Sequence, residues 1–159
     1  MGDFQRIYEE YAGPVYRFLL QLTACEDQAE ELLQETFYRA LQHIDQFRGQ
    51  CSLYTWLCQI GKNAWYKECR RRGRFRDMKL CEGGFPDHDP QEILLEKEER
   101  HRMRKAILNL PELYRDVFVI HVLGGVKLRE VASLYGKSES WARVTFYRAK
   151  QQLLKEVQK

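Results

Sequence analysis

The sequence has little proline, no long apolar run and no closely paired cysteines. Only four prolines occur in 159 residues, and no segment approaches the roughly 20 apolar residues that are needed to cross a bilayer. The first apolar stretch, around Val15 to Leu22, is short and follows acidic residues, so it is unlike a signal peptide. We therefore expect a protein of the cytoplasm.

Cysteine and histidine exclude further classes of protein. The five cysteines form no CxxC pair, and no histidine lies at zinc-finger spacing from them. We expect reduced thiols that help to fill helical cores. The four histidines are scattered, and neither a nucleophile motif nor a phosphate loop is present. We therefore predict no enzyme, and so no catalytic residue, metal, cofactor or small-molecule substrate. The cysteines are Cys25, Cys51, Cys58, Cys69 and Cys81.

Strand-like alternation is also missing, because nearly every long segment has helical period. The pattern predicts an all-α chain. Ser52 is expected to cap the third helix, and Pro14 is expected to kink or restart the first. The predicted helices cover about 4–22, 29–44, 52–72, 93–110, 114–121, 128–135 and 138–157.

Glycine and proline concentrate between residues 73 and 91, where periodicity fades. We interpret this segment as a flexible linker, and Asp89-Pro90 as the start of the next helix. The prediction is two small helical domains: residues 1–75 and 93–159, joined by a linker at 76–92.

Charge is unevenly distributed, although the formal net charge is only +3. Residues 62–79 contain eight Lys or Arg against two acids, residues 81–100 contain seven acids, and residues 137–159 contain six Lys or Arg against two acids. One basic segment in each domain suits two contacts with one polyanion. Each basic segment taken alone could equally be a solvated helix face.

Residues 128–144 have the pattern of a helix-turn-helix. Ala132 is small where the two helices would cross, Gly136 permits a tight turn, and Ser138 would cap the second helix. The early residues of that helix would face a DNA major groove. A helical pair of this kind also occurs as plain scaffolding.

Two further segments carry chemistry. Residues 27–41 combine a broad apolar face with a polar face, and residues 47–72 place an aromatic-rich helix ahead of a basic run. The polar face could dock on a partner protein or could simply be solvated. Aromatic and cationic side chains together suit unstacked bases and phosphates, although Trp56 and Trp65 taken singly are more typical of a core.

Together these three segments resemble the extracytoplasmic-function sigma factors, a group of the sigma-70 family, over nearly the whole chain. Four phrases carry the resemblance: Ala29-Glu-Glu-Leu-Leu-Gln-Glu-Thr-Phe, Thr55-Trp-Leu-Cys-Gln-Ile-Gly-Lys-Asn, Leu110-Pro-Glu-Leu-Tyr-Arg-Asp-Val-Phe, and Tyr147-Arg-Ala-Lys. The resemblance implies a sigma2-like domain, a sigma4-like helix-turn-helix domain, and a subunit that directs transcription initiation.

The resemblance also implies site residues. The polar face would bind the β′ clamp helices of core RNA polymerase through Glu31, Gln34, Glu35 and Tyr38. The third helix and the loop before it would capture a flipped base of the minus-ten element and hold nearby phosphates, through Phe47, Arg48, Ser52, Tyr54, Trp56, Lys62, Asn63, Lys67, Arg70 and Arg71. The last helix would read the minus-thirty-five element through Ser140, Arg143, Val144, Tyr147, Arg148 and Lys150.

The family further implies promoter DNA, the polymerase β flap and an anti-sigma factor as partners. The last could hold the chain at the inner face of the membrane. The sequence departs from the family pattern at four positions, which are Lys127, Trp141, Val144 and Thr145. Two rival functions remain: a helix-turn-helix regulator that never meets polymerase, and a sigma-like adaptor that no longer reads DNA.

Overall fold

In the computed structural model, the described residues are 2–71 and 90–158, with side chains described for 2–71 and 98–158. All regular elements in these ranges are helices, which confirms the all-α prediction. Most of the predicted linker, together with Asp89 and Cys81, lies outside the described residues.

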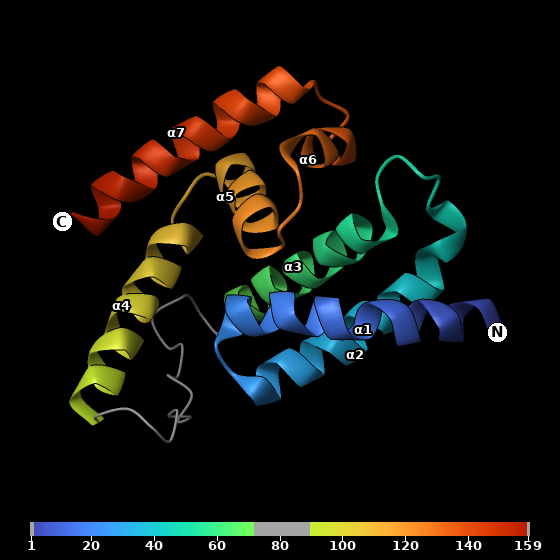
Figure 1. Ribbon diagram of the computed structural model, residues 1–159, viewed down its shortest axis with the longest axis horizontal. Helices are drawn as coiled ribbons and strands as arrows, with labels where there is room; N and C mark the ends of the chain where they lie inside the picture. The colour runs from blue at the N-terminus through green and yellow to red at the C-terminus, as the bar shows by residue number, and fades with distance from the viewer. Residues whose placement is uncertain (1, 72–89, 159) are drawn as a thin grey trace.

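The first part of the chain is a group of three long helices (Figure 1). They are α1 (Gly2–Thr23), α2 (Glu26–His43) and α3 (Leu53–Arg71), and a short 3-10 helix, η1 (Ile44–Gln46), follows α2. Ser52 accepts a hydrogen bond from the backbone N–H of Thr55 at 3.2 Å, which confirms Ser52 as the cap of α3.

Pro14 does not break α1, so the expected restart of the helix is wrong. The helix runs from Gly2 to Thr23 with Pro14 inside it. Apolar side chains on both sides of the proline pack on the same core, from Phe4 and Ile7 before it to Phe18 and Leu22 after it. Burial of this continuous stripe offsets the lost backbone hydrogen bond.

The second part of the chain contains two long and three short helices among the described residues, and the helix-turn-helix is one pair of them. They are α4 (Pro90–Leu108), α5 (Glu112–Phe118), the π-helix η3 (Val119–Leu123), α6 (Leu128–Leu134) and α7 (Glu139–Val157). Gly136 has a φ of +64° in the turn between α6 and α7. Ser138 accepts from the Trp141 N–H at 3.1 Å. Both features match the predicted turn and cap.

The wide turn of η3 ends at Gly124. The Gly124 N–H donates to the carbonyl of Val119 at 3.2 Å, which closes the π-type turn. A Cβ at Gly124 would lie 2.5 Å from the Ile120 carbonyl oxygen, so no other residue fits without a shift of the backbone.

The two parts pack against each other, and the main hydrophobic core is shared between them. Buried side chains of α1, α2 and α3 form one cluster with Ile107 and Leu108 of α4, Val119 of η3 and Leu153 of α7. A smaller cluster lies inside the second part and includes Val117, Ile120 and Val131. In Figure 1, α5 and α6 lie directly above α3.

The cysteines agree only partly with the expectation of reduced thiols. Cys51, Cys58 and Cys69 are buried thiols outside any disulfide, as expected. Burial raises the pKa of Cys51 to about 11 and that of Cys58 to about 12, so both thiols stay protonated and unreactive at neutral pH. Cys25 is disulfide-bonded, and the expectation is wrong there.

Candidate functional site

The polar face of α2 projects outward from the three-helix group. Leu32, Phe37 and Ala40 are buried on the opposite side of the helix. Glu35 is half-buried and accepts a hydrogen bond from Arg39 at 2.7 Å, which fixes the direction of its carboxylate. Tyr38 is 63% exposed. The four residues that were expected to form this face therefore lie side by side on α2, namely Glu31, Gln34, Glu35 and Tyr38.

One side of α3 carries a solvent-facing stripe. Trp56, Asn63, Lys67 and Arg70 are separated by seven, four and three residues, so they lie along one face of the helix. Trp56 is half-buried, and the other three are exposed. We call these four residues the α3 stripe. It offers an aromatic ring, an amide and two cations in a line, which is chemistry that suits single-stranded DNA.

The loop before α3 meets the stripe at its aromatic end. The rings of Phe47 and Trp56 lie 5.1 Å apart between centroids, in a tilted arrangement. Arg48 and Gln50 are exposed, and the Arg48 N–H donates to the Gln50 side chain at 3.2 Å. The exposed Arg48 thus directly follows the half-buried Phe47 of this aromatic pair.

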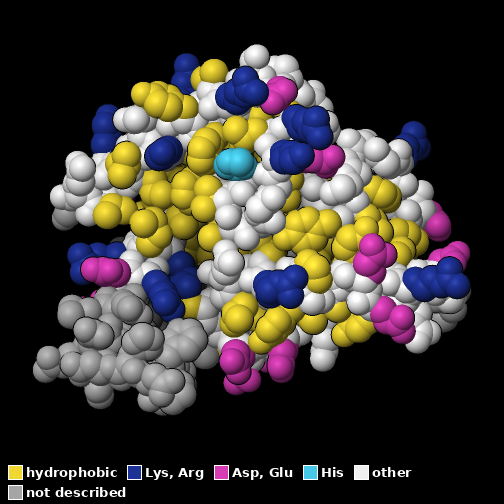
Figure 2. Space-filling view, in the orientation of Figure 1, with side chains coloured by type: hydrophobic (Ala, Val, Ile, Leu, Met, Phe, Trp, Pro, Cys, Tyr) yellow, Lys and Arg dark blue, Asp and Glu magenta, His cyan; other side chains and the backbone are white. Residues whose placement is uncertain are grey.

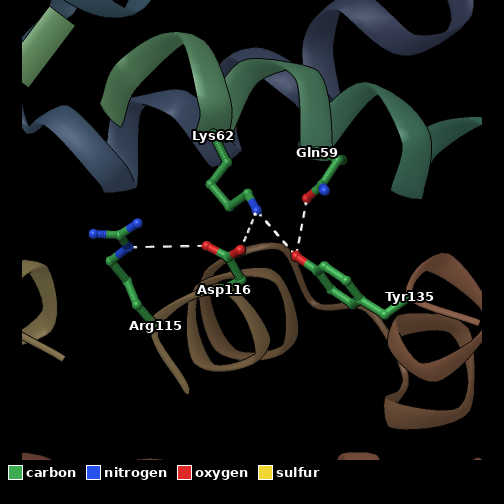
Figure 3. Close-up of polar contacts among 5 residues, drawn as sticks. All are labelled: Gln59, Lys62, Arg115, Asp116 and Tyr135. Carbon is green, nitrogen blue, oxygen red and sulfur yellow. Dashed lines mark hydrogen bonds and ion pairs between the residues drawn. The ribbon is translucent and has the colours of Figure 1, made fainter. Parts of the chain in front are cut away.

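The other side of α3 is covered by the second part of the chain, and Lys62 is fully buried there. Its ammonium lies 3.1 Å from the Asp116 carboxylate of α5 and donates to the Tyr135 hydroxyl at 3.0 Å. That hydroxyl donates to the Gln59 side chain at 3.2 Å. Figure 3 shows Lys62 pointing from α3 to both partners. The structure thus does not bring Lys62 to the surface with the other expected phosphate-binding residues.

Burial changes the ionisation of this buried group. Desolvation lowers the pKa of Lys62 to about 8, against the opposing effect of the Asp116 carboxylate. Lys62 therefore still carries its proton at neutral pH, and the contact with Asp116 is an ion pair. Arg115 lies beside the pair, with its guanidinium 3.9 Å from the centre of the Tyr66 ring.

Three further contacts join the two parts. The Tyr54 hydroxyl donates to the Gly124 carbonyl at 2.7 Å. The Ser52 N–H donates to the Glu130 carboxylate at 2.9 Å, so an acid from α6 lies at the N-terminus of α3. Arg104 of α4 donates to the Leu22 carbonyl at 3.1 Å, at the end of α1. The second part therefore engages three residues that were expected to lie near DNA, which are Ser52, Tyr54 and Lys62.

The outer face of α7 carries all six residues expected to read the minus-thirty-five element, and every one is exposed. Val144 is 49% exposed and Tyr147 is 62% exposed. Arg143 pairs with Glu139 at 2.9 Å. Ala142, Ala149 and Leu153 on the opposite side are buried. The helix therefore presents cations and two apolar groups outward.

Of the positions that depart from the family pattern, Val144 is the one that changes the outer face of α7. Trp141 is half-buried and packs near Tyr135, with ring centroids 6.1 Å apart. Thr145 is buried. Lys127 precedes α6 and makes no side-chain cap hydrogen bond. Trp141 and Thr145 therefore belong to the packing of the second part.

Sequence reasoning missed the residues of the second part that engage α3. Asp116, Glu130 and Tyr135 lie within the motifs described above, but the sequence did not single them out as partners of α3. A signal exists for Asp116, because the apolar residues Val117 and Phe118 follow it in a segment that is expected to be helical, and a buried carboxylate requires a partner. The sequence alone does not say that Lys62 is that partner.

On the face shown in Figure 2, acidic side chains lie mainly over α1 and α2, and Lys and Arg side chains lie mainly over α5 to α7. No described helix is long and apolar enough to cross a membrane. Among the described residues, no three metal-ligating side chains form a group that could hold an ion.

Comparison with known sequences places both parts of the chain. Residues 7–75 match the model described as sigma-70 region 2, and residues 100–153 match that described as sigma-70, region 4. The ECF RNA polymerase sigma factor SigM of Bacillus subtilis is 29% identical over 150 residues, which cover 92% of this chain and 90% of SigM. The RNA polymerase sigma factor YlaC of the same organism is 26% identical and covers 99% and 93%.

Solved structures share the fold. The Bartonella quintana sigma factor RpoE, solved with the anti-sigma factor NepR, has a TM-score of 0.62 at 21% identity and covers 99% of this chain and 98% of its own. CnrH, solved with the cytosolic domain of CnrY, has a TM-score of 0.59 at 19% identity and covers 94% and 84%. With both family regions matched in order, the chain belongs to the sigma-70 family and is a sigma factor of the extracytoplasmic-function type.

Proposed function

We propose that this chain is a promoter-specificity subunit, which joins core RNA polymerase, recognises and melts promoter DNA, and starts transcription. The observation that carries the proposal is the presence of three separate exposed surfaces, on α2, α3 and α7, each with the chemistry its role needs. Sigma factors are non-enzymatic initiation factors, and the polymerase performs the bond-forming chemistry.

The division of labour follows the two domains that we propose at residues 1–75 and 93–159, with the linker at 76–92. The α2 face binds the β′ clamp helices, and the second domain meets the β flap and the minus-thirty-five element. Tyr38 combines 63% exposure with a position beside a fixed carboxylate. Exposed aromatic residues of this kind often dominate protein interfaces.

Substitution of Gln34 by alanine is expected to weaken core binding about five- to tenfold, because one or two interface hydrogen bonds are lost. The matched control is Gln5→Ala on α1, since Gln5 is also exposed and makes one weak contact to Glu9 at 3.4 Å. Fluorescence anisotropy with purified core polymerase measures both. Equal affinities of the two variants for core polymerase would contradict a role of α2 in this interface.

The α3 stripe and the Phe47 loop hold the melted minus-ten strand. Extrusion of a base from the duplex costs a few kcal/mol, and each base stacked on an aromatic ring regains about 1–3 kcal/mol. The Phe47–Trp56 pair supplies the aromatic surface, and Asn63 supplies an amide that can pair with a base edge. Lys67 and Arg70 neutralise phosphates beyond it.

The outer face of α7 reads the upstream element. Arg148 is exposed in the middle of this face, next to Tyr147. Substitution of Arg148 by alanine is expected to weaken promoter binding about tenfold, since a base or phosphate contact is worth about 1–3 kcal/mol. Arg6→Ala, at an exposed arginine of α1, is the control. Footprinting of the holoenzyme on a promoter measures the loss, and full occupancy by Arg148→Ala would refute the role.

We also propose an anti-sigma factor as a partner. RpoE was solved with the anti-sigma factor NepR, and CnrH with the cytosolic domain of CnrY. The present chain exposes apolar side chains on α2 and α7 that a partner could cover. The chain then acts in the cytoplasm, and a membrane-anchored inhibitor would hold it at the inner face of the membrane.

In vitro transcription with purified core on a genomic library tests the whole proposal. A sigma factor makes core start RNA at defined sites, whereas a stand-alone helix-turn-helix regulator binds DNA but starts none. An adaptor that no longer reads DNA binds core without giving transcripts. Defined transcripts that appear only when this chain is added are the expected result.

A further inference from the structure

We propose that Val144 reads the C5-methyl group of a pyrimidine, ordinarily thymine, in the major groove of the upstream promoter element. The inference deepens the proposed function, on which it rests, because it names what one position of α7 recognises. The observation behind it is an apolar side chain that is 49% exposed in the middle of a polar, DNA-facing surface. Val144 departs from the family pattern, so this contact is a property of the present chain.

Val144 lies at the centre of the outer face of α7. Ser140 and Arg148 are four residues before and after it, and Tyr147 is three residues after it, so all three adjoin it on the helix. The Ser138 cap starts the helix, and Val144 lies within about two turns of it, in the part of the helix that meets base edges. In Figure 1, α7 runs along the outer edge of the molecule, with α5 and α6 on one side of it.

The packing of the described residues gives no reason for an apolar side chain at this position. Neither hydrophobic cluster of the described chain includes Val144, whereas Trp141 and Phe146 on the same helix pack against the second cluster. Valine also loses side-chain freedom in a helix, so helix formation does not favour it there. The apolar surface of Val144 is therefore available for a contact outside the chain.

A valine can recognise only one feature of the base edges. Its side chain has no hydrogen-bond donor or acceptor, so it cannot pair with the polar atoms that distinguish guanine, cytosine and adenine in the major groove. Thymine alone among the four bases presents an apolar group there, the C5-methyl. Contact with this methyl removes both apolar surfaces from water. Any other base at the same position leaves Val144 against polar atoms or water.

The cations around Val144 position the helix, and the valine adds specificity. Arg148 and Lys150 are exposed on the same face, and Arg143 is paired with Glu139 at 2.9 Å. Contacts of such cations with phosphates fix the register of a helix in the groove but carry no sequence information. A fixed register brings Val144 to the same base pair in every promoter, so one methyl group is read at one position.

The experiment removes the methyl group without changing any hydrogen bond. Promoter duplexes are first selected with this chain and core RNA polymerase from a library that is randomised over the upstream element. Each thymidine of the selected element is then replaced in turn by deoxyuridine, which differs from it only by the absence of the methyl. One replacement is expected to weaken binding of the holoenzyme about fourfold, the effect of burying about one aliphatic carbon.

Three variants assign the effect to Val144. Val144→Ser removes the apolar surface and should bind the thymine and uracil duplexes equally. Val144→Ile keeps a branched apolar side chain and should retain the difference. Val157→Ser makes the same change at a valine that is 45% exposed at the end of α7, and should also retain the difference. Both positions are exposed, so helix content by circular dichroism should be unchanged in all three variants.

A second pair of duplexes distinguishes the two pyrimidines that carry this methyl group. Cytosine at the sensitive position is compared with 5-methylcytosine, each paired with guanine. Methylation is expected to tighten wild-type binding about fourfold and to have no effect on Val144→Ser. A response in both pairs means that Val144 reads the methyl of either pyrimidine, and a response in the thymine pair alone limits its source to thymine. Either result supports the contact.

Two results would overturn the inference. In the first, no thymine of the selected element responds to replacement by uracil. In the second, Val144→Ser weakens the thymine and uracil duplexes equally, which would mean that Val144 contacts a protein instead of the methyl group. If the methyl response is present but the holoenzyme starts no RNA, the contact stands and the promoter-specificity function fails. If defined transcripts appear without the response, the function stands and the methyl contact fails.

Discussion

Substitution of Phe18 by alanine is expected to lower the free energy of unfolding by about 3–5 kcal/mol, the largest effect on stability that we predict for a single residue. Phe18 is 1% exposed and belongs to the core shared by α1, α2 and α3. Truncation removes the apolar contacts of a whole ring and leaves a cavity that the long helices cannot fill by moving. Urea denaturation followed by circular dichroism measures the change.

Tyr147→Ala is the matched control, because it truncates an aromatic side chain that is 62% exposed. Its expected effect on stability is within about 0.5 kcal/mol. A similar loss for both variants would mean that the core does not lie where the structure places it. α1 and α3 pack against the buried side of α2. Phe18→Ala should therefore also weaken binding to core RNA polymerase at temperatures where the variant begins to unfold.

The helices were predictable because most of the chain is consistent at every level. The apolar stripes at Phe18 and Leu32, the cap at Ser138 and the turn at Gly136 each follow from local rules that the structure obeys. Local rules failed at Pro14, because the energy of burying the stripe on both sides of the proline does not appear in a helix propensity.

The candidate site was predictable where it depends on helical spacing alone. The α2 face and the outer face of α7 need only the register of one amphipathic helix, and the structure places the residues expected on each of them on one side of that helix. The sequence pattern does not distinguish the exposed side of α3 from the side that the second part covers. Aromatic and basic residues occupy both sides of this helix, and burial of Lys62 depends on Asp116, which is 54 residues later in the chain. A contact of that range is a property of the packing of the two domains.

This distinction gives the prediction with the largest expected effect on DNA binding, Lys67→Glu/Arg70→Glu. Both residues are exposed on the α3 stripe, so charge reversal removes two phosphate contacts and adds repulsion. Binding to a fluorescein-labelled single-stranded DNA of about 12 nucleotides should weaken about 100-fold at low salt. The magnitude of the slope of log affinity against log salt should decrease by at least about 1.4. Titrations at four or more salt concentrations measure both quantities.

Arg6→Glu/Arg102→Glu changes the net charge by the same amount at exposed arginines of α1 and α4, and so isolates the local contacts from the overall field of the protein. It should weaken binding only a few-fold and leave the slope nearly unchanged. Equal losses in the two double variants would mean that DNA responds to total charge and not to the stripe. A selective loss in Lys67→Glu/Arg70→Glu, with core binding retained through α2, would separate the DNA surface of α3 from the polymerase surface beside it.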